Sequence, residues 1–467
     1  MPEYKLTYFN TRALCEPIRC CLHYAGVEFE DKRISHADWP EIKPTTPHGL
    51  LPLFEVDGKM LTQSGSILRF VARLSGLTGK DSWEEAKADE TFQYFVDGVS
   101  ITSAGGYIYD KAGVVKSPDP EAAYKVFVPV ANRNLQYYTK MLEEAGNGFI
   151  LPSGLTYADF AVYTHALTVR NVDPELAKNY PKVYEFVERI EKLPQLQNYL
   201  ADWSVADAGL TGNFFWKSTD FAVDDPAAGR SVGDAFSFAY WMLEIVEKLL
   251  ALCDYFGHNV LSMPGKLPIR TALVDMPEYK LTYFDCRAYA EPIRLCLHYG
   301  GIEFEDYKFT AEQWPAIKPT TPHGVVPVFE VDGKILTQSG AILRYVARLT
   351  GLVGKDSWEE AKADETYHYF VDSTHVTSAG GYIYDKAGIL KSADIKAFYD
   401  VFVKVATKNL DNYTKMLEEA RNGHSLTLRN VDPELAKKFP KVYEFVQRIE
   451  KLPQLQKYLK ERPDTLN

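Results

Sequence analysis

The chain has 467 residues, and a prior of roughly 150 residues per domain predicts about three domains rather than one core. Hydrophobic residues make up 46% and charged residues 25%, the balance of a globular protein. The net charge of −11 argues against a broad nucleic-acid-binding surface, because such surfaces are strongly basic. The 6 cysteines form no CxxC pair and the first residues show no secretory signal, so we expect reduced thiols, no zinc site and a cytoplasmic location.

The first residues predict a strand followed by a helix. Residues 4–9 alternate and are rich in β-forming side chains, which is typical of a strand. Glu16 and Pro17 then open a helix, since proline is tolerated in the first helical turn. Apolar residues recur at i, i+3, i+4 and i+7 up to Gly26, which ends the pattern. Cys21 lies on this apolar face, so we interpret it as a core residue rather than a nucleophile.

A second strand, a hairpin and a second helix follow. The strand is expected over 28–34, and the hairpin joins strands at 51–56 and 59–62 through an Asp-Gly turn. Ser64 can cap a helix that carries a buried apolar stripe. The order over residues 1–80 is therefore β-α-β, a loop, then β-β-α.

From Trp83 onward the strand signals disappear and an all-helical region is predicted. Helices are expected over 84–110, 120–145, 156–169 and 182–193. Thr156 and Asp159 have the capping-box spacing, in which each side chain bonds to the backbone N–H of the other residue.

The whole pattern then occurs a second time. Met1 to Phe9 recurs as Met276 to Phe284, and long stretches up to residue 388 match at the same offset of 276 − 1 = 275. Near the end the offset falls to 430 − 171 = 259, because residues 149–164 have no counterpart after Gly423. Copy one (residues 1–202) and copy two (residues 276–467) are therefore two versions of one subunit.

Residues 203–275 belong to neither copy. A run of apolar residues over 238–252 has helical spacing, but Glu244, Glu247 and Lys248 interrupt it and make it a poor membrane span. Two interpretations stay open: an amphipathic linker helix that docks on one copy, or a poorly ordered insert.

Several motifs in both copies resemble one enzyme family. Copy one carries YKLTYFNTR at 4–12, EPIR at 16–19, ADWPEIK at 37–43, PHGLLPLFEVDG at 47–58 and QSGSILRF at 63–70. Copy two carries close variants of each motif. This combination resembles the sigma class of glutathione transferases, which includes glutathione-dependent prostaglandin D synthases. The resemblance implies an α/β plus all-α fold, with a thioredoxin-like domain before a helical domain in each copy.

The resemblance also implies domain boundaries. Thioredoxin-like, glutathione-binding domains are expected over 1–80 and 276–355. Helical domains are expected over 83–202 and, lacking about one helix, over 358–467. The interval 203–275 is the linker or insert.

The family's glutathione site carries over onto both copies. The tyrosine that hydrogen-bonds the glutathione sulfur corresponds to Tyr8 and Tyr283, the two predicted catalytic residues. The remaining glutathione-binding positions are Trp39, Lys43, Gly49, Leu50, Leu51, Pro52, Gln63, Ser64 and Asp97 in copy one. In copy two they are Trp314, Lys318, Gly324, Val325, Val326, Pro327, Gln338, Ser339 and Asp372. Glutathione is the implied co-substrate, with no metal required.

Each implied role has a physical reason. A free thiol with a pKa of about 8.5 is only a few per cent thiolate near neutral pH, and a phenol O–H stabilises the thiolate by hydrogen bonding. Ser64 opens a helix, where free N–H groups favour the γ-glutamyl carboxylate. Lys43 supplies a cation for the glycyl carboxylate, Trp39 an indole donor, and the Leu51-Pro52 segment an extended backbone. The family's proline here is cis.

Two departures keep the function open. Sigma-class proteins commonly have arginine where copy one has Leu14 and copy two has Tyr289, so thiol activation can be weaker here. Leu50 and Val325 replace the usual polar residue of the same loop. The principal hypothesis is glutathione conjugation to hydrophobic electrophiles; the alternatives are a prostaglandin-H D-isomerase and a non-catalytic glutathione-binding or structural relative.

The acceptor pocket and the partner are also expectations. The acceptor pocket is expected near Phe9 and Tyr107, and near Phe284 and Tyr382, although both tyrosines can equally pack between helices. Family members pair as dimers, so the two copies can pair within one chain or between chains. Asp97 would then reach the site of copy two, and Asp372 the site of copy one. No membrane or nucleic-acid partner is expected.

Overall fold

The computed structural model describes residues 2–35, 37–100, 105–111, 116–202, 277–373, 382, 395–420 and 438–462. Contacts divide the chain into two compact units, residues 1–235 and 236–467, each of which holds one copy. The interval 203–275 lies outside the described residues, so neither interpretation of it is tested. Within the described residues, no helix is both long enough and apolar enough to cross a bilayer.

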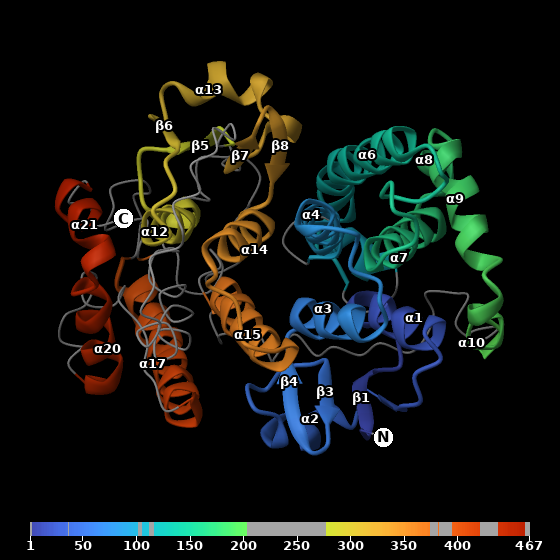
Figure 1. Ribbon diagram of the computed structural model, residues 1–467. Coiled ribbons are helices and arrows are strands. Elements are labelled where there is room, and N and C mark those ends of the chain that lie inside the picture. Colours follow the sequence, from blue (N-terminus) through green and yellow to red (C-terminus); the bar gives the residue numbers. More distant parts are fainter. Residues whose placement is uncertain are drawn as a thin grey trace. The chain divides into compact units, whose positions relative to one another are not determined.

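Copy one begins with a four-stranded sheet and three helices. The strands are β1 (Tyr4–Phe9), β2 (Glu30–Ile34), β3 (Leu53–Val56) and β4 (Lys59–Thr62), in the order β2-β1-β3-β4. β1 is parallel to β2 and antiparallel to β3. The helices are α1 (Glu16–Tyr24), α2 (Trp39–Ile42) and α3 (Ser64–Leu74). Figure 1 shows α1 and α3 between this sheet and the later helices of the copy.

The predicted elements exist, with corrected bounds. The second strand begins at Glu30, which pairs with Lys5, rather than at residue 28. The hairpin begins at Leu53, because Pro52 has no N–H to donate to a ladder. Ser64 is not the cap of α3 but its first helical residue; Gln63 occupies the cap position. Cys21 is fully buried, as expected of a core residue.

The second part of copy one is helical throughout. Its helices are α4 (Ser82–Val99), α5 (Gly106–Lys111), α6 (Pro120–Ala145), α7 (Tyr157–Val172), α8 (Pro174–Ala177), α9 (Pro181–Glu191) and α10 (Gln197–Asp202). The single helix expected over 84–110 is wrong: α4 ends at Val99, because Ser100 is extended with φ −68° and ψ 137°. The short helices α2, α8 and α10 were not expected from the sequence.

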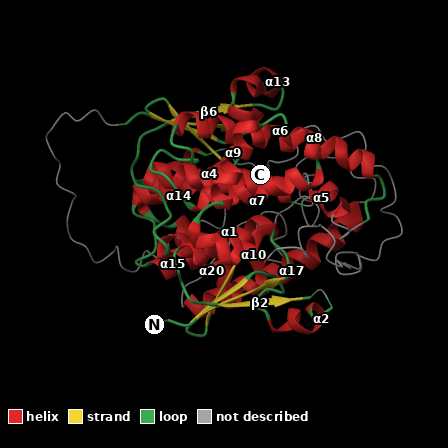
Figure 2. Cartoon of the chain, turned by 90° about the vertical axis from the view of Figure 1, so that its right-hand side faces the viewer, coloured by secondary structure: helices red, strands yellow, loops and turns green. Residues whose placement is uncertain are grey.

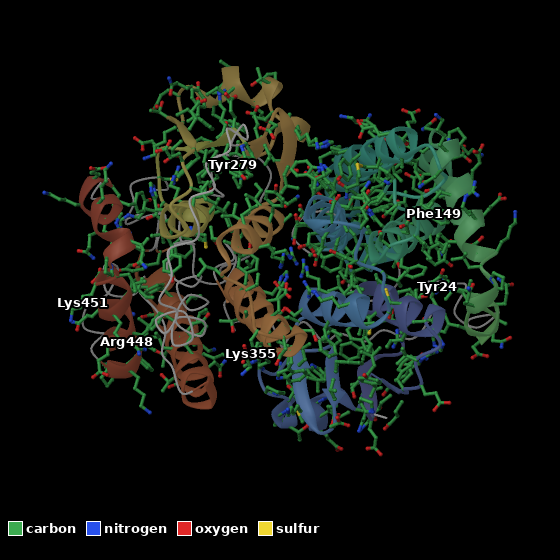
Figure 3. All side chains as sticks on the ribbon, in the orientation of Figure 1. Tyr24, Phe149, Tyr279, Lys355, Arg448 and Lys451 are labelled. Carbon is green, nitrogen blue, oxygen red and sulfur yellow. The ribbon has the colours of Figure 1, made fainter. Side chains whose placement is uncertain are left out.

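Helix α7 is the centre of the helical part. It packs against α1, α4 and α9, and most of its side chains are buried. The predicted capping box is confirmed: Asp159 accepts from the Thr156 N–H at 2.7 Å and from the Ile150 N–H at 2.8 Å. The ring of Phe160 lies 6.0 Å from that of Tyr24 on α1. Figure 3 labels Tyr24 and also Phe149, the first residue of the block that copy two lacks.

Copy two repeats the first part of copy one. Its strands are β5 (Tyr279–Phe284), β6 (Glu305–Phe309), β7 (Val328–Val331) and β8 (Lys334–Thr337), in the order β6-β5-β7-β8. Its helices are α12 (Glu291–Tyr299), α13 (Trp314–Ile317), α14 (Ser339–Thr350), α15 (Ser357–Ser373), α17 (Ile395–Ala420), α20 (Pro440–Glu450) and α21 (Gln456–Glu461). Figure 2 shows the strands of the two copies, in yellow, as separate sheets.

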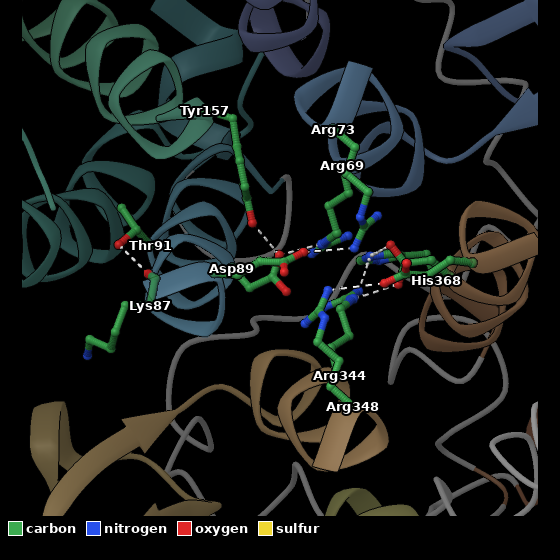
Figure 4. Close-up of polar contacts among 12 residues, drawn as sticks. Arg69, Arg73, Lys87, Asp89, Thr91, Tyr157, Arg344, Arg348 and His368 are labelled. Carbon is green, nitrogen blue, oxygen red and sulfur yellow. Dashed lines mark hydrogen bonds and ion pairs between the residues drawn. The ribbon is translucent and has the colours of Figure 1, made fainter. Parts of the chain in front are cut away.

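An ion pair, buried in copy one and partly buried in copy two, joins the sheet domain to the helical part. In copy one, Arg69 on α3 pairs with Asp89 on α4, and the Tyr157 hydroxyl donates to the same carboxylate oxygen at 2.5 Å (Figure 4). In copy two, Arg344 pairs with Asp364 at 2.6 Å. Tyr157 belongs to the block that copy two lacks, so this second donor has no sequence counterpart there.

Candidate functional site

The sheet topology brings three chain segments to one edge. Thr7, the last β1 residue that pairs with β3, lies opposite Leu53 at the start of β3, and Leu53 pairs with Thr62 at the end of β4. Neighbouring strands lie about 4.8 Å apart, so the residues that continue past these pairs are close in space. Copy two has the same registers at Thr282 and Val328 and at Val328 and Thr337.

The sequence-predicted residues occupy this edge. Tyr8 follows Thr7, the last β1 residue that pairs with β3, and is itself paired with Arg33 of β2. Pro52 precedes β3, and Gln63 follows β4. The aromatic ring of Trp39 is anchored there, because its centroid lies 5.7 Å from that of Phe9. The equivalent residues of copy two are Tyr283, Pro327, Gln338, Trp314 and Phe284.

Tyr8 is a buried phenol. Its side chain is 8% exposed, and burial raises its pKa above the ordinary value of 10.0. The neighbouring Tyr109 and Cys15 act in the same direction, whereas the Arg19 charge and the backbone N–H of Leu14 oppose the shift. Tyr8 therefore stays protonated at neutral pH and can donate a hydrogen bond.

A buried arginine fixes the chain beyond Tyr8. The Arg19 guanidinium on α1 donates to Asp31 at 3.1 Å and to the Thr11 carbonyl at 2.7 Å. Its central carbon lies 6.0 Å from the centroid of the Tyr8 ring. A cation is thus present near Tyr8 although position 14 is leucine.

The loop before β3 has the backbone shape that the resemblance implied. The peptide bonds Leu51–Pro52 and Val326–Pro327 are both cis. Gly49 has φ +67°, a left-handed conformation that favours glycine. The Lys43 side chain runs beside it, since a Cβ on Gly49 would lie 3.6 Å from Lys43 Cγ. Lys318 lies beside Gly324 in the same way in copy two.

The start of α3 offers a turn of free backbone N–H groups. Gln63 has φ +68° and its side chain makes no capping bond, so it turns the chain sharply into the helix. Ser64 lies in the first turn of an 11-residue helix. Gln338 and Ser339 adopt the same conformation at the start of α14, with φ +67° at Gln338.

Tyr283 has different neighbours from Tyr8. It is 1% exposed, and burial raises its pKa well above 10.0, with Cys286 and Tyr289 contributing in the same direction. The backbone of Tyr289 lowers the pKa of this phenol, as that of Leu14 does in copy one. Arg294 donates to Asp306 at 2.9 Å and to the Cys286 carbonyl at 2.8 Å, so the positioning arginine is repeated.

The expected acceptor tyrosines pack between helices. The ring of Tyr107 lies 4.9 Å from those of Tyr124 and Phe127 on α6, and Tyr382 packs on Tyr399 and Phe402 in the same way. Tyr109, two residues on, is the residue whose phenol affects Tyr8. Sequence reasoning missed it, because both tyrosines fit a helix and the pattern does not say which one faces β1.

The predicted acidic residues Asp97 and Asp372 belong to α4 and α15. Each was expected to reach the site of the other copy, so that role stays a prediction.

Comparison with known proteins places the chain. The profile described as "Glutathione S-transferase, N-terminal domain" matches residues 4–73 and 279–348, and the profile "Glutathione S-transferase, C-terminal domain" matches 109–202. Glutathione S-transferase 1 of Ascaris suum is 34% identical over 202 residues, which are 43% of this chain and 97% of that protein. The chain belongs to the glutathione S-transferase family.

Other members of the glutathione S-transferase family are similar to the same extent. Glutathione S-transferase 4 of Caenorhabditis elegans is 36% identical over 206 residues, 43% of this chain and 97% of that protein. The crystal structure of the glutathione S-transferase from Ascaris lumbricoides is 34% identical, covers 44% of this chain and 99% of that one, and has a TM-score of 0.41. Because the N-terminal profile matches two separate ranges of the chain, that domain is present twice, in tandem.

Proposed function

We propose that this protein is a glutathione transferase in which Tyr8 and Tyr283 activate the glutathione thiol. Each hydroxyl donates to the sulfur and stabilises the thiolate, while the thiol proton passes to solvent. The thiolate then forms a C–S bond to an electrophilic carbon of a small hydrophobic substrate, and the leaving group departs with the electron pair of the bond that breaks. The observation that carries the proposal is the burial of Tyr8 at the sheet edge, which raises its pKa and keeps the donor proton in place.

The remaining edge residues would bind the rest of the tripeptide. Lys43 and Trp39 would hold the glycine end, the backbone of Leu51 would pair with the cysteinyl unit, and the first turn of α3 at Ser64 would bind the γ-glutamyl carboxylate. Residues 1–80 and 276–355 would be the glutathione-binding domains, and 83–202 and 358–467 the helical domains. Phe9 and Tyr109 are the proposed start of the acceptor pocket.

Pairing of the two copies is a further part of the proposal. Asp97 and Asp372 would each reach the γ-glutamyl amine bound by the other copy, either within one chain or in a homodimer. The motifs support our proposal of sigma-class membership, and the few cysteines without a CxxC pair support our proposal of a cytoplasmic location. Turnover of a prostaglandin endoperoxide, compared with conjugation of a simple electrophile, would identify an isomerase.

The test is conjugation of glutathione to a chromogenic electrophile by the full chain. Tyr8→Phe and Tyr283→Phe should each remove the contribution of one copy. The double variant should lose about tenfold to hundredfold in kcat/KM at pH 6.5, where a thiol of pKa about 8.5 is only about 1% ionised. Tyr4→Phe, on the same strand but stacked on Phe54, is the matched control and should leave the rate unchanged. Unchanged conjugation by the double variant would refute the proposal.

A further inference from the structure

A buried carboxylate links the last described helix of each copy to its sheet domain. Glu16, the first residue of α1, is 0% exposed. The Tyr199 hydroxyl on α10 donates to Glu16 Oε2 at 2.7 Å, across 183 residues of sequence. In copy two, Tyr458 on α21 donates to Glu291 in the same way. The contact is thus repeated in both copies, although their helical parts differ.

Glu16 follows directly on the loop that connects the strand of Tyr8 to α1. Residues 10–15, here named the thiol loop, connect β1 to α1. The N–H groups of Cys15 and Glu16 bond to the Arg12 carbonyl at 3.2 and 3.0 Å. The backbone of Leu14, in the same loop, lies close enough to the Tyr8 phenol to lower its pKa. The Arg12 side chain returns to Glu16, with 3.6 Å between Nε and Oε1. A shift of Glu16 would therefore displace the Arg12 carbonyl and with it the loop segment that includes Leu14.

The carboxylate depends on these partners. Burial raises the pKa of Glu16, and Arg12, Arg19 and the Tyr199 hydroxyl oppose that shift. A buried carboxylate that loses a donor must find another partner or take up a proton. The Arg12 side chain, which belongs to the thiol loop, is one such partner, because its Nε is 3.6 Å from Glu16 Oε1 and can move closer. Loss of the Tyr199 hydroxyl would therefore be transmitted to the backbone around Leu14.

We propose that Tyr199 is a positioning residue for the thiol site of copy one, acting through Glu16 and the thiol loop on Tyr8. The inference rests on the proposed function and extends it to a helix that contributes nothing to the sheet edge. The Tyr199 ring also stacks on His23, with centroids 4.2 Å apart, so phenylalanine keeps the packing and removes the hydroxyl alone.

In copy two, the last helix makes an additional charged contact with the buried glutamate. Arg462, at the end of α21, donates to Glu291 Oε1 at 3.1 Å, and Arg294 Nη1 lies 3.8 Å from Oε2. Glu291 therefore keeps a charged partner from the same segment when the Tyr458 hydroxyl is removed. The same substitution should have a smaller effect in copy two than in copy one.

The test uses the full chain with one copy reporting at a time. In a Tyr283→Phe background, copy one reports; in a Tyr8→Phe background, copy two reports. The readouts are the pKa of the bound glutathione thiol, followed by thiolate absorbance against pH, and kcat and KM at pH 6.5. The matched control is Tyr184→Phe, which removes a hydroxyl bonded to the Ala166 carbonyl at 3.1 Å in the helical part.

Tyr199→Phe should raise the pKa of the bound thiol and lower kcat about tenfold, with KM for glutathione within about twofold of the parent. Tyr458→Phe should lower kcat by less than about threefold, because Arg462 remains. Tyr184→Phe should change neither value. Equal behaviour of Tyr199→Phe and Tyr184→Phe would overturn the positioning role.

A second variant covers the case in which Tyr199→Phe does not fold. Glu16→Gln keeps an acceptor for the Tyr199 hydroxyl but releases Arg12, so the bound-thiol pKa should again rise; an unchanged value would overturn the link. Tyr8→Phe separates the two claims. If Tyr8→Phe itself leaves the thiol pKa unchanged, the proposed function fails; if only the Tyr199 and Glu16 variants do, the positioning role alone is wrong.

Discussion

The two sheet domains of this chain are nearly the same, whereas the two helical parts are not. Every strand of copy two lies 275 residues after its counterpart, with the same pairing registers. In the helical part, copy one has a capped and buried α7, and copy two lacks the residues for its first half. The sheet edge of the candidate site is therefore specified by local residues of the sheet domain. The helical core depends on one segment, residues 149–164.

The missing segment carries much of that core. Tyr157, Phe160 and Tyr163 of α7 are 0–1% exposed. Burial of each large side chain contributes about 1.5–3 kcal/mol, against a typical domain stability of about 5–15 kcal/mol. Loss of this block thus removes a large fraction of the stability that a single copy has.

The largest expected effect comes from restoring the block. Residues 276–467 alone should aggregate, and insertion of the sequence of residues 149–164 after Gly423 should give a soluble, monodisperse protein by size-exclusion chromatography. The same insert with serine at the Tyr157, Phe160 and Tyr163 positions is the control and should not rescue. A monodisperse 276–467 without any insert would show that the helical parts do not differ in this way.

The next effect isolates the capping box of copy one. Asp159→Ala leaves the N–H groups of Thr156 and Ile150 without their acceptor, and should cost about 4 kcal/mol in chemical unfolding of copy one. Asp173→Ala is the control, because Asp173 caps the short α8 at 3.0 Å near the surface and should cost about 1 kcal/mol. Equal losses of unfolding free energy would mean that burial of the Asp159 cap adds nothing to its contribution to stability.

A pH dependence of slightly smaller size is expected from His165. Burial lowers its pKa to about 4 from 6.5, and its Nδ1 lies 3.0 Å from the Tyr138 hydroxyl. Between these two pKa values the unfolded chain binds more protons than the folded one, so stability rises with pH and is complete above about 6.5. The loss on going to pH 4 is about 3 kcal/mol at most.

His165→Gln keeps an acceptor for the Tyr138 hydroxyl but does not titrate. It should flatten the stability of copy one between pH 4 and 6.5, measured by urea unfolding. A pH profile identical to that of the parent would contradict the assignment of this window to His165.

The smallest effect compares one helix position in the two copies. Ser66 on α3 is fully buried, and its hydroxyl has no hydrogen-bond partner among the described residues. Copy two has Ala341 at this position. Ser66→Ala should therefore leave stability unchanged or raise it by up to about 1 kcal/mol, and Ala341→Ser should lower it, in denaturant titrations. Clear destabilisation by Ser66→Ala would reveal a role for the hydroxyl.

The local sequence pattern predicted the elements of the sheet domain well. Most features that it did not predict depend on contacts between residues far apart in the sequence. The strand at Tyr8, the Asp-Gly hairpin and the Thr156–Asp159 box are set by neighbouring residues, and each was predicted. The break falls at Ser100, which is neither glycine nor proline, so the pattern predicted a continuous helix. Tyr109 was missed because its side chain is selected by tertiary packing. Tyr199 and Glu16 meet across 183 residues, so no spacing rule could pair them.

The central claim is that a phenol at the sheet edge meets the glutathione sulfur. A crystal structure of the full chain with bound glutathione tests it most directly. The account predicts the sulfur within about 3.5 Å of the hydroxyl oxygens of Tyr8 and Tyr283, with the γ-glutamyl carboxylate at the first turns of α3 and α14. A sulfur that points away from both tyrosines, with glutathione bound elsewhere, would contradict it.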